Sequence, residues 1–128
     1  MTDREFNALR KRIRKIADRW HAELGLRWWK VVMLWERSAP DGETLAEVNY
    51  SWQYQRAEIT FYMPNLLGAS DDDIEGTVVH EFCHILVAEL QQHRGKEHVE
   101  HTVCSLTNAF RWVRDAAIGG KLPRPAKG

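Results

Sequence analysis

Two histidines four residues apart, His80 and His84, stand in a segment whose apolar residues recur at helical intervals. On a helix this spacing places both imidazoles on one face, where each nitrogen can bind the same metal ion at about 2.0–2.1 Å. Glu81 follows His80 and can enter the same cleft without binding the metal, as general base for a metal-activated water. The pattern therefore predicts a helix that carries a catalytic site for one Zn²⁺ ion. Two solvent-facing histidines on an ordinary amphipathic helix are the alternative.

The residues around this motif predict the limits of its helix. Ser70 followed by Asp73 is typical of a helix start, and acids in the first turn favour the positive end of the helix dipole. An apolar stripe would bury the helix against a sheet; it consists of Ile74, Val78, Phe82 and Ile85. We expect this helix over residues 71–91, a turn over 92–95 and a last helix that begins near residue 96 and is stopped by Gly119 and Gly120.

The first half of the chain predicts one helix and three strands. Apolar residues at intervals of three and four indicate an amphipathic helix over residues 3–24, with basic residues on its outer face. Alternating or β-branched and aromatic runs then predict strands over 28–36, 46–52 and 56–63, in an antiparallel or mixed sheet. The sequence therefore predicts an α+β fold in the order helix, three strands, helix, helix.

Length and composition favour an ordinary globular protein. The 128 residues fit one domain, which we place at residues 1–120, before a basic and flexible tail at 121–128. The 18 basic and 18 acidic residues balance, so global charge does not indicate nucleic acid or membrane as a partner. No signal peptide or membrane span is recognisable, and the two cysteines, Cys83 and Cys104, have no disulfide or zinc-ribbon spacing. We expect a cytoplasmic protein with reduced thiols.

A catalytic zinc ion needs a third protein ligand and one open position. The longer form of the motif, with a glycine and a third histidine further along the helix, is absent, because Val87 and Leu90 stand at those positions. The third ligand must come from the last helix or the turn before it. The candidates there are His93, Glu97, His98, Glu100 and His101.

Helix geometry ranks these candidates. If the motif helix runs to about residue 91, an antiparallel return regains the level of the metal near residues 99–104, which favours Glu100. If the helix ends earlier, near residue 88, Glu97 is favoured instead. We keep Glu100 first and Glu97 second, with His101 third.

Three stretches of the chain resemble one family: residues 54–61, 79–84 and 97–106. They are similar to small zinc metallopeptidases often encoded by phages, which look like minimal gluzincins. Such proteins have a short sheet, a motif helix and a second helix that donates a glutamate. The resemblance implies a zincin-like fold and zinc-dependent peptide hydrolysis, with His80, Glu81 and His84 in their family roles. It favours an acid at the position of Glu97.

A more distant resemblance, to the SprT-like proteases, rests on the stretch from His93 to Glu97. Those proteins have a glycine directly after the histidine, whereas Arg94 intervenes here, so we do not expect His93 to be a ligand.

Two further expectations concern the substrate. In zincins the strand before the motif helix usually offers its edge to an extended peptide, and by resemblance that strand is the one over residues 56–63. The tetrahedral intermediate also needs a hydrogen-bond donor, for which the chain offers Tyr50, Tyr54, Tyr62, His98 and His101. Tyr54 is the candidate that we name.

The sequence thus predicts a zinc metalloendopeptidase that acts on a peptide or protein substrate. Two alternatives stay open. One is a non-catalytic adaptor in which a metal with four protein ligands only stabilises the fold. The other is a DNA-associated phage protein, anchored through the basic N-terminal helix, whose exposed cations include Arg10, Lys11, Arg14 and Lys15.

Overall fold

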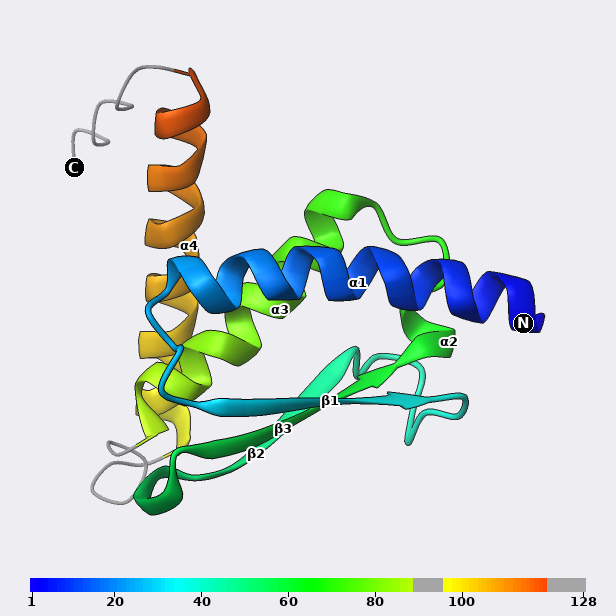
Figure 1. The fold of residues 1–128 in the computed structure, drawn as a ribbon, viewed down its shortest axis with the longest axis horizontal. Helices are drawn as coiled ribbons and strands as arrows, with labels where there is room; N and C mark the ends of the chain where they lie inside the picture. The colour runs from blue at the N-terminus through cyan, green and yellow to red at the C-terminus, as the bar shows by residue number, and fades with distance from the viewer. Residues whose placement is uncertain (89–95, 120–128) are drawn as a thin grey trace.

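The computed structural model describes residues 1–88 and 96–119, apart from the side chains of residues 52, 96–98 and 118 (Figure 1). It is an α+β structure with four α-helices and a three-stranded mixed sheet. The elements are α1 (Asp3–Glu23), β1 (Lys30–Glu36), β2 (Ala46–Ser51), the 3₁₀ turn η1 (Trp52–Tyr54), β3 (Arg56–Tyr62), α2 (Met63–Leu66), α3 (Asp71–Leu86) and α4 (Lys96–Gly119). The predicted α+β order of elements is confirmed, with α2 added. The basic tail at 121–128 lies outside the described residues.

Helix α1 follows from the predicted periodicity. Its buried side chains are those of the apolar stripe: Phe6, Leu9, Ile13, Ala17 and Trp20. A capping box defines its start: the Thr2 side chain accepts from the Glu5 backbone N–H, and the Glu5 carboxylate accepts from the Thr2 backbone N–H. Lys11 and Lys15 are exposed, as predicted for the outer face, whereas Arg12 and Arg19 reach α3 and pair there with Asp71 and Glu75.

The sheet has the order β1-β3-β2. β1 and β3 are parallel, with Met33 opposite Ile59, and β2 and β3 are antiparallel, with Val48 opposite the same Ile59. The prediction that residues 56–63 form the free edge is therefore wrong, because β3 is the central strand and β2 lies at the edge. Alternation along a strand shows which face is buried, but strand order depends on pairing between distant segments.

The helices cover one face of this sheet. In Figure 1, α1 and α3 lie on the same side of the strands, and α4 crosses the end of α3 and extends away from the sheet. Ile59 and Phe61 of β3 project into the core between these layers, together with Ile13 of α1 and Val78 and Phe82 of α3. All five are at most 1% exposed, so the core fixes α3 directly against the sheet. Within the described residues no helix combines the length and apolar character that a membrane span requires.

Helix α3 begins where the sequence predicts but ends earlier. Ser70 is its N-cap, and its hydroxyl accepts from the backbone N–H of Asp73 at 3.1 Å. The helix ends at Leu86, with Val87 as its C-cap, and not near residue 91 as predicted. The following residues, 89–95, lie outside the described part of the chain. The short helix α2 was not predicted; Pro64 stands in its first turn, which is a position that proline favours.

Candidate active site

One carboxylate meets both histidines of the motif. His80 Nε2 lies 2.8 Å from Glu100 Oε1, and His84 Nε2 lies 3.0 Å from Glu100 Oε2. A nitrogen from each histidine and an oxygen from Glu100 all lie within 4.8 Å of one another. The three side chains are between 18% and 45% exposed, so the group lies at the surface of a cleft and solvent can reach it.

The packing of two helices brings these residues together. His80 and His84 are one turn apart on α3, and their ring centroids are separated by 5.0 Å. The opposite side of the same turns, including Phe82, is buried in the core. On α4, Val99 and Val103 are buried and hold this helix against the core, which leaves the neighbouring Glu100 beside the histidines.

This group fits a zinc ion by its chemistry. Two imidazole nitrogens and one carboxylate are a common ligand set of catalytic zinc, which leaves a coordination position for water or substrate. Each Nε2 atom faces a carboxylate oxygen, so either an N–H hydrogen of the imidazole or a metal ion must lie between the two atoms. The structure therefore supports a metal-binding group of His80, His84 and Glu100, while the identity of the metal belongs to the proposal below.

The other predicted ligands are not part of this group. His101 is exposed on α4 and does not join the cluster. The side chains of Glu97 and His98, and the whole of His93, lie outside the described residues. Glu100 takes the central place even though α3 ends at Leu86, the condition under which helix geometry favoured Glu97.

Glu81 is buried beside the metal-binding group. The residue is only 7% exposed to solvent. Removal from water raises the pKa of Glu81 to about 8, with smaller contributions from the negative charges of Glu100 and Glu47. In the metal-free protein this carboxyl group therefore holds a proton near neutral pH, and a bound dication would oppose that shift. Near neutral pH such a group can both hold and release a proton, whereas an exposed glutamate is already ionised.

Burial also affects one of the histidines. Removal from water lowers the pKa of His84, and the neighbouring His80 lowers it further, whereas Glu100 acts in the opposite direction. The neutral form of an imidazole is the form that binds metal ions, so this environment favours the ligand state.

A cleft of about 720 Å³ contains His80, Glu81, His84 and Glu100. Every residue of the edge strand β2 also lines it, so the strand edge and the metal-binding group face the same space. Tyr50 belongs to this lining, and burial raises the pKa of its phenol. Tyr54 lies in η1, is 83% exposed and is not among the lining residues. The structure does not bring Tyr54 to the cleft.

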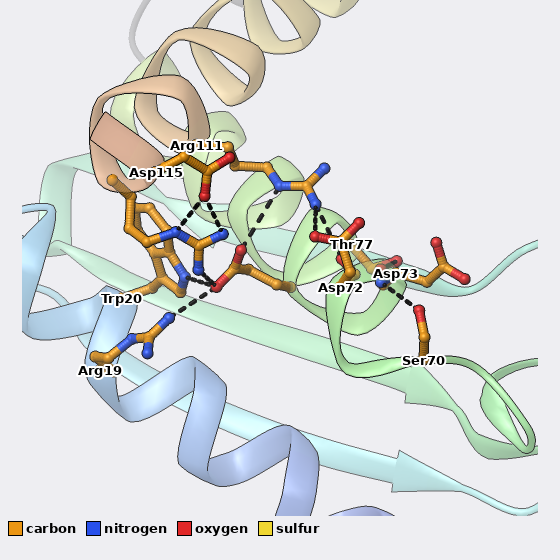
Figure 2. A network of polar contacts seen from close by, with 10 residues as sticks. Arg19, Trp20, Ser70, Asp72, Asp73, Thr77, Arg111 and Asp115 are labelled. Atoms are coloured by element: carbon orange, nitrogen blue, oxygen red, sulfur yellow. Dashed lines mark hydrogen bonds and ion pairs between the residues drawn. The ribbon is translucent and has the colours of Figure 1, made fainter. Parts of the chain in front are cut away.

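A second carboxylate cluster ties the same helices together on the opposite side of α3. Glu75 of α3 is 4% exposed, and its Oε2 accepts from Arg19 Nη2 at 2.7 Å, from Trp20 Nε1 at 3.1 Å and from Arg114 Nη1. Figure 2 shows Arg19 and Trp20 of α1 and Arg111 of α4 gathered around this point. Arg111 also donates to the Asp72 carboxylate at 2.7 Å. This network fixes α1, α3 and α4 relative to one another.

Sequence reasoning missed this network and one residue of the cleft. The sequence pattern assigns Glu75 no role, because no local signal distinguishes it from other acids near the start of a helix. Glu47 lines the cleft from β2, and its Oε2 accepts from the Tyr62 hydroxyl at 2.9 Å. The alternation in β2 predicts that Glu47 faces away from the core, but its place beside the metal-binding group depends on the strand order.

Comparisons with protein-family models, with curated proteins and with solved structures found no match to this chain.

Proposed function

We propose that the protein is a zinc-dependent peptidase that uses the cleft between β2, α3 and α4. The observation that carries this proposal is the position of Glu100, whose two oxygens meet the Nε2 atoms of His80 and His84 at 2.8 and 3.0 Å. The group lines the same cleft as Glu81 and the edge strand β2. A metal-binding group, a buried acid–base residue and a free strand edge are the parts that peptide hydrolysis needs.

A zinc ion held by His80, His84 and Glu100 would lower the pKa of water toward about 7 and polarise the peptide carbonyl. Glu81 accepts the proton that the attacking water loses and delivers it to the leaving amine nitrogen. Its burial suits this exchange, because a carboxyl group removed from water holds a transferred proton more readily. Surrounding apolar side chains, including the fully buried Phe82 and Val78, fix the backbone on which Glu81 stands.

The edge of β2 supports an extended substrate. β2 pairs only with β3 among the described strands, so one side of its backbone remains available for pairing with a peptide. That side faces the cleft, since all six residues of Ala46–Ser51 line it. A peptide that adds to this edge has its backbone held by hydrogen bonds while one of its carbonyls lies near the metal-binding group. This assignment replaces the predicted edge at residues 56–63.

Tyr50 is our candidate for the group that stabilises negative charge on the carbonyl oxygen. It lines the cleft, and its raised pKa keeps the phenol protonated as a hydrogen-bond donor. Tyr54 has no comparable position. Replacement of Tyr50 by Phe would lower kcat by about 10–1000-fold if the hydroxyl has this role, while zinc content stays unchanged.

The adaptor alternative needs a closed site with four protein ligands. Among the described side chains only His80, His84 and Glu100 form the group, and His101 remains exposed outside it. The described side chains therefore favour an open catalytic site over a closed structural one.

The test combines metal content with activity. Mass spectrometry of the purified protein should detect close to one zinc per chain in the unaltered protein and in Glu81→Gln, and none in His84→Ala. Cleavage of a mixture of unstructured peptides should require zinc, stop with a chelator and fall at least about 100-fold in Glu81→Gln. Glu23→Gln, a change of an exposed acid at the end of α1, is the matched control and should keep both properties. A folded protein that stays metal-free after incubation with zinc would refute the proposal.

A further inference from the structure

Among the carboxylates that line the cleft, Glu47 differs from the others in how its charge is balanced. Glu47, Glu81 and Glu100 line it, and no lysine or arginine does so among the described residues. A bound zinc ion carries two positive charges, which balance the charges of Glu81 and Glu100. Among the described residues of the cleft wall, the charge of Glu47 is then the one left without a counter-charge. A substrate that supplies a cation at this point would satisfy it.

Glu47 stands on the face of β2 that points away from the core. Ala46, Val48 and Tyr50 pack against the core, whereas Glu47 and Asn49 are exposed on the opposite face. A second hollow of about 440 Å³ lies on this outer side and shares Glu47 and Asn49 with the cleft. Its lining includes Glu36 of β1 and, among the described residues, no lysine or arginine. The two hollows therefore adjoin the same stretch of β2, and among the described residues neither is lined by a lysine or arginine.

The position of the Glu47 side chain is fixed from β3. Tyr62 donates its hydroxyl to Glu47 Oε2 at 2.9 Å, which holds the carboxylate at the edge of the sheet. No ion pair between described residues includes Glu47, and Oε1 accepts no hydrogen bond from the described residues. The carboxylate is thus oriented by a neutral donor while its charge stays available.

We propose that Glu47 selects substrates with a lysine or arginine at the position of the bound peptide that lies opposite Glu47 on β2. This inference rests on the proposed peptidase function. A peptide strand paired with β2 places every second side chain on the outer face, about 4.5–5.5 Å from its cross-strand neighbour. One of those side chains lies opposite Glu47 and enters the second hollow, where its cation pairs with the Glu47 carboxylate.

The experiment uses neutral, unstructured peptides in which a single lysine or glutamine is moved along the sequence. Cleavage of each pair by the zinc-loaded, full-length protein gives the ratio of kcat/KM for lysine over glutamine at each position. We expect a ratio of about two to five at one position, falling toward one in Glu47→Gln and at high ionic strength. Tyr62→Phe should reduce the ratio without removing a charge, and Glu23→Gln should leave it as in the unaltered protein.

Binding of the same peptides to zinc-loaded Glu81→Gln protein, followed by fluorescence anisotropy, separates recognition from chemistry. A ratio near one at every position, or a preference that survives in Glu47→Gln, would overturn the inference while cleavage upholds the peptidase. Glu47-dependent binding of the lysine peptides without cleavage by the unaltered protein would uphold recognition of the cation by Glu47 and refute the peptidase. Neither binding nor cleavage would overturn both.

Discussion

Helices α3 and α4 are joined by a carboxylate at two places, and the two junctions differ in partners and burial. Near the end of α3, Glu100 lies between the imidazoles of His80 and His84 and is 45% exposed. Nearer the start of α3, Glu75 is 5% exposed at its side chain and accepts from two arginines and a tryptophan. A carboxylate thus joins α3 and α4 at both places, with imidazoles as its partners at one and guanidinium groups at the other.

The difference in partners indicates that the contacts of Glu75 are structural, whereas those of Glu100 can bind a ligand. Guanidinium groups are permanently charged, so the charge of Glu75 is balanced within the protein, although its Oε1 accepts no hydrogen bond from the described residues. Imidazoles near neutral pH are mostly uncharged, and the environment of His84 favours that form. The two histidines therefore give Glu100 no permanent counter-charge, and a cation from solution can supply one. We call the contacts of Glu75 the closed junction and those of Glu100 the open junction. The closed junction fixes the angle between α3 and α4 near the start of α3, and the open junction leaves a binding site near the end of α3.

The largest expected effect is on the closed junction. Glu75→Ala leaves the partly buried Arg114 without its main counter-charge, and we expect the free energy of unfolding to fall by about 3–5 kcal/mol. Urea denaturation measures this change. Asp71→Ala, which removes the exposed ion pair with Arg12, is the matched control and should cost at most about 1 kcal/mol. If Glu75→Ala does not fold, Glu75→Gln keeps the volume and should show a smaller loss. Equal effects of Glu75→Ala and Asp71→Ala would contradict the comparison.

The next effect concerns the open junction. Glu100→Ala removes one of the three proposed zinc ligands, and we expect zinc affinity to fall by at least about 100-fold, measured by competition with a chromogenic chelator. In the metal-free protein the same change should alter the free energy of unfolding by no more than about 1 kcal/mol, because Glu100 is 45% exposed. A large loss of metal-free stability would mean that Glu100, like Glu75, is chiefly structural.

The motif and its surroundings differ in how far the sequence predicts them. Spacing on one helix is local, so His80, Glu81 and His84 were identified from the residues alone. Glu100 followed from the idea of an antiparallel return, although the helix end assumed in that argument was wrong. Nothing between Leu86 and Gly95 marks an end, because residues 87–94 include neither glycine nor proline. Local propensity allowed a longer helix than the structure has.

The strand order and the Glu75 network could not be predicted from the sequence, because both depend on contacts between segments that are far apart in the chain. The alternation of β2 and β3 is similar, and only the pairing of β3 with both neighbours shows that β2 is the edge. Likewise, Glu75 meets arginines that are 56 and 39 positions away in the chain. Such contacts depend on how three helices pack, and the charge pattern of one helix does not contain that information.

The third prediction uses the pH dependence of the open junction. Glu81 has an ordinary pKa of 4.5 in the unfolded chain and a raised pKa of about 8 in the metal-free fold. Between these values folding takes up one proton at Glu81, so the contribution of Glu81 to the free energy of unfolding is most favourable below about pH 4.5 and falls as pH rises toward 8. We expect Glu81→Gln to reduce this decline by on the order of 1–3 kcal/mol, measured by urea denaturation at several pH values in the presence of a chelator. An identical decline in both proteins would show that Glu81 is not the titrating group.

The smallest expected effect tests how rigid the closed junction is. A Cβ at Gly76 would lie 3.1 Å from Nη1 of Arg111, which is the far end of a flexible side chain. Alanine favours a helix over glycine by about 1 kcal/mol. Arg111 is held loosely to Glu75, with 3.7 Å between its Nε and Glu75 Oε1, whereas Arg114 donates directly to the other oxygen. The other partner of Arg111 is the Asp72 carboxylate, whose side chain is 74% exposed and can follow, so a shift of a few tenths of an ångström costs little. We expect Gly76→Ala to stabilise the protein by up to about 0.5 kcal/mol in urea denaturation. A loss of more than about 1 kcal/mol would mean that Arg111 is as tightly fixed as Arg114, and that the whole network acts as one rigid unit.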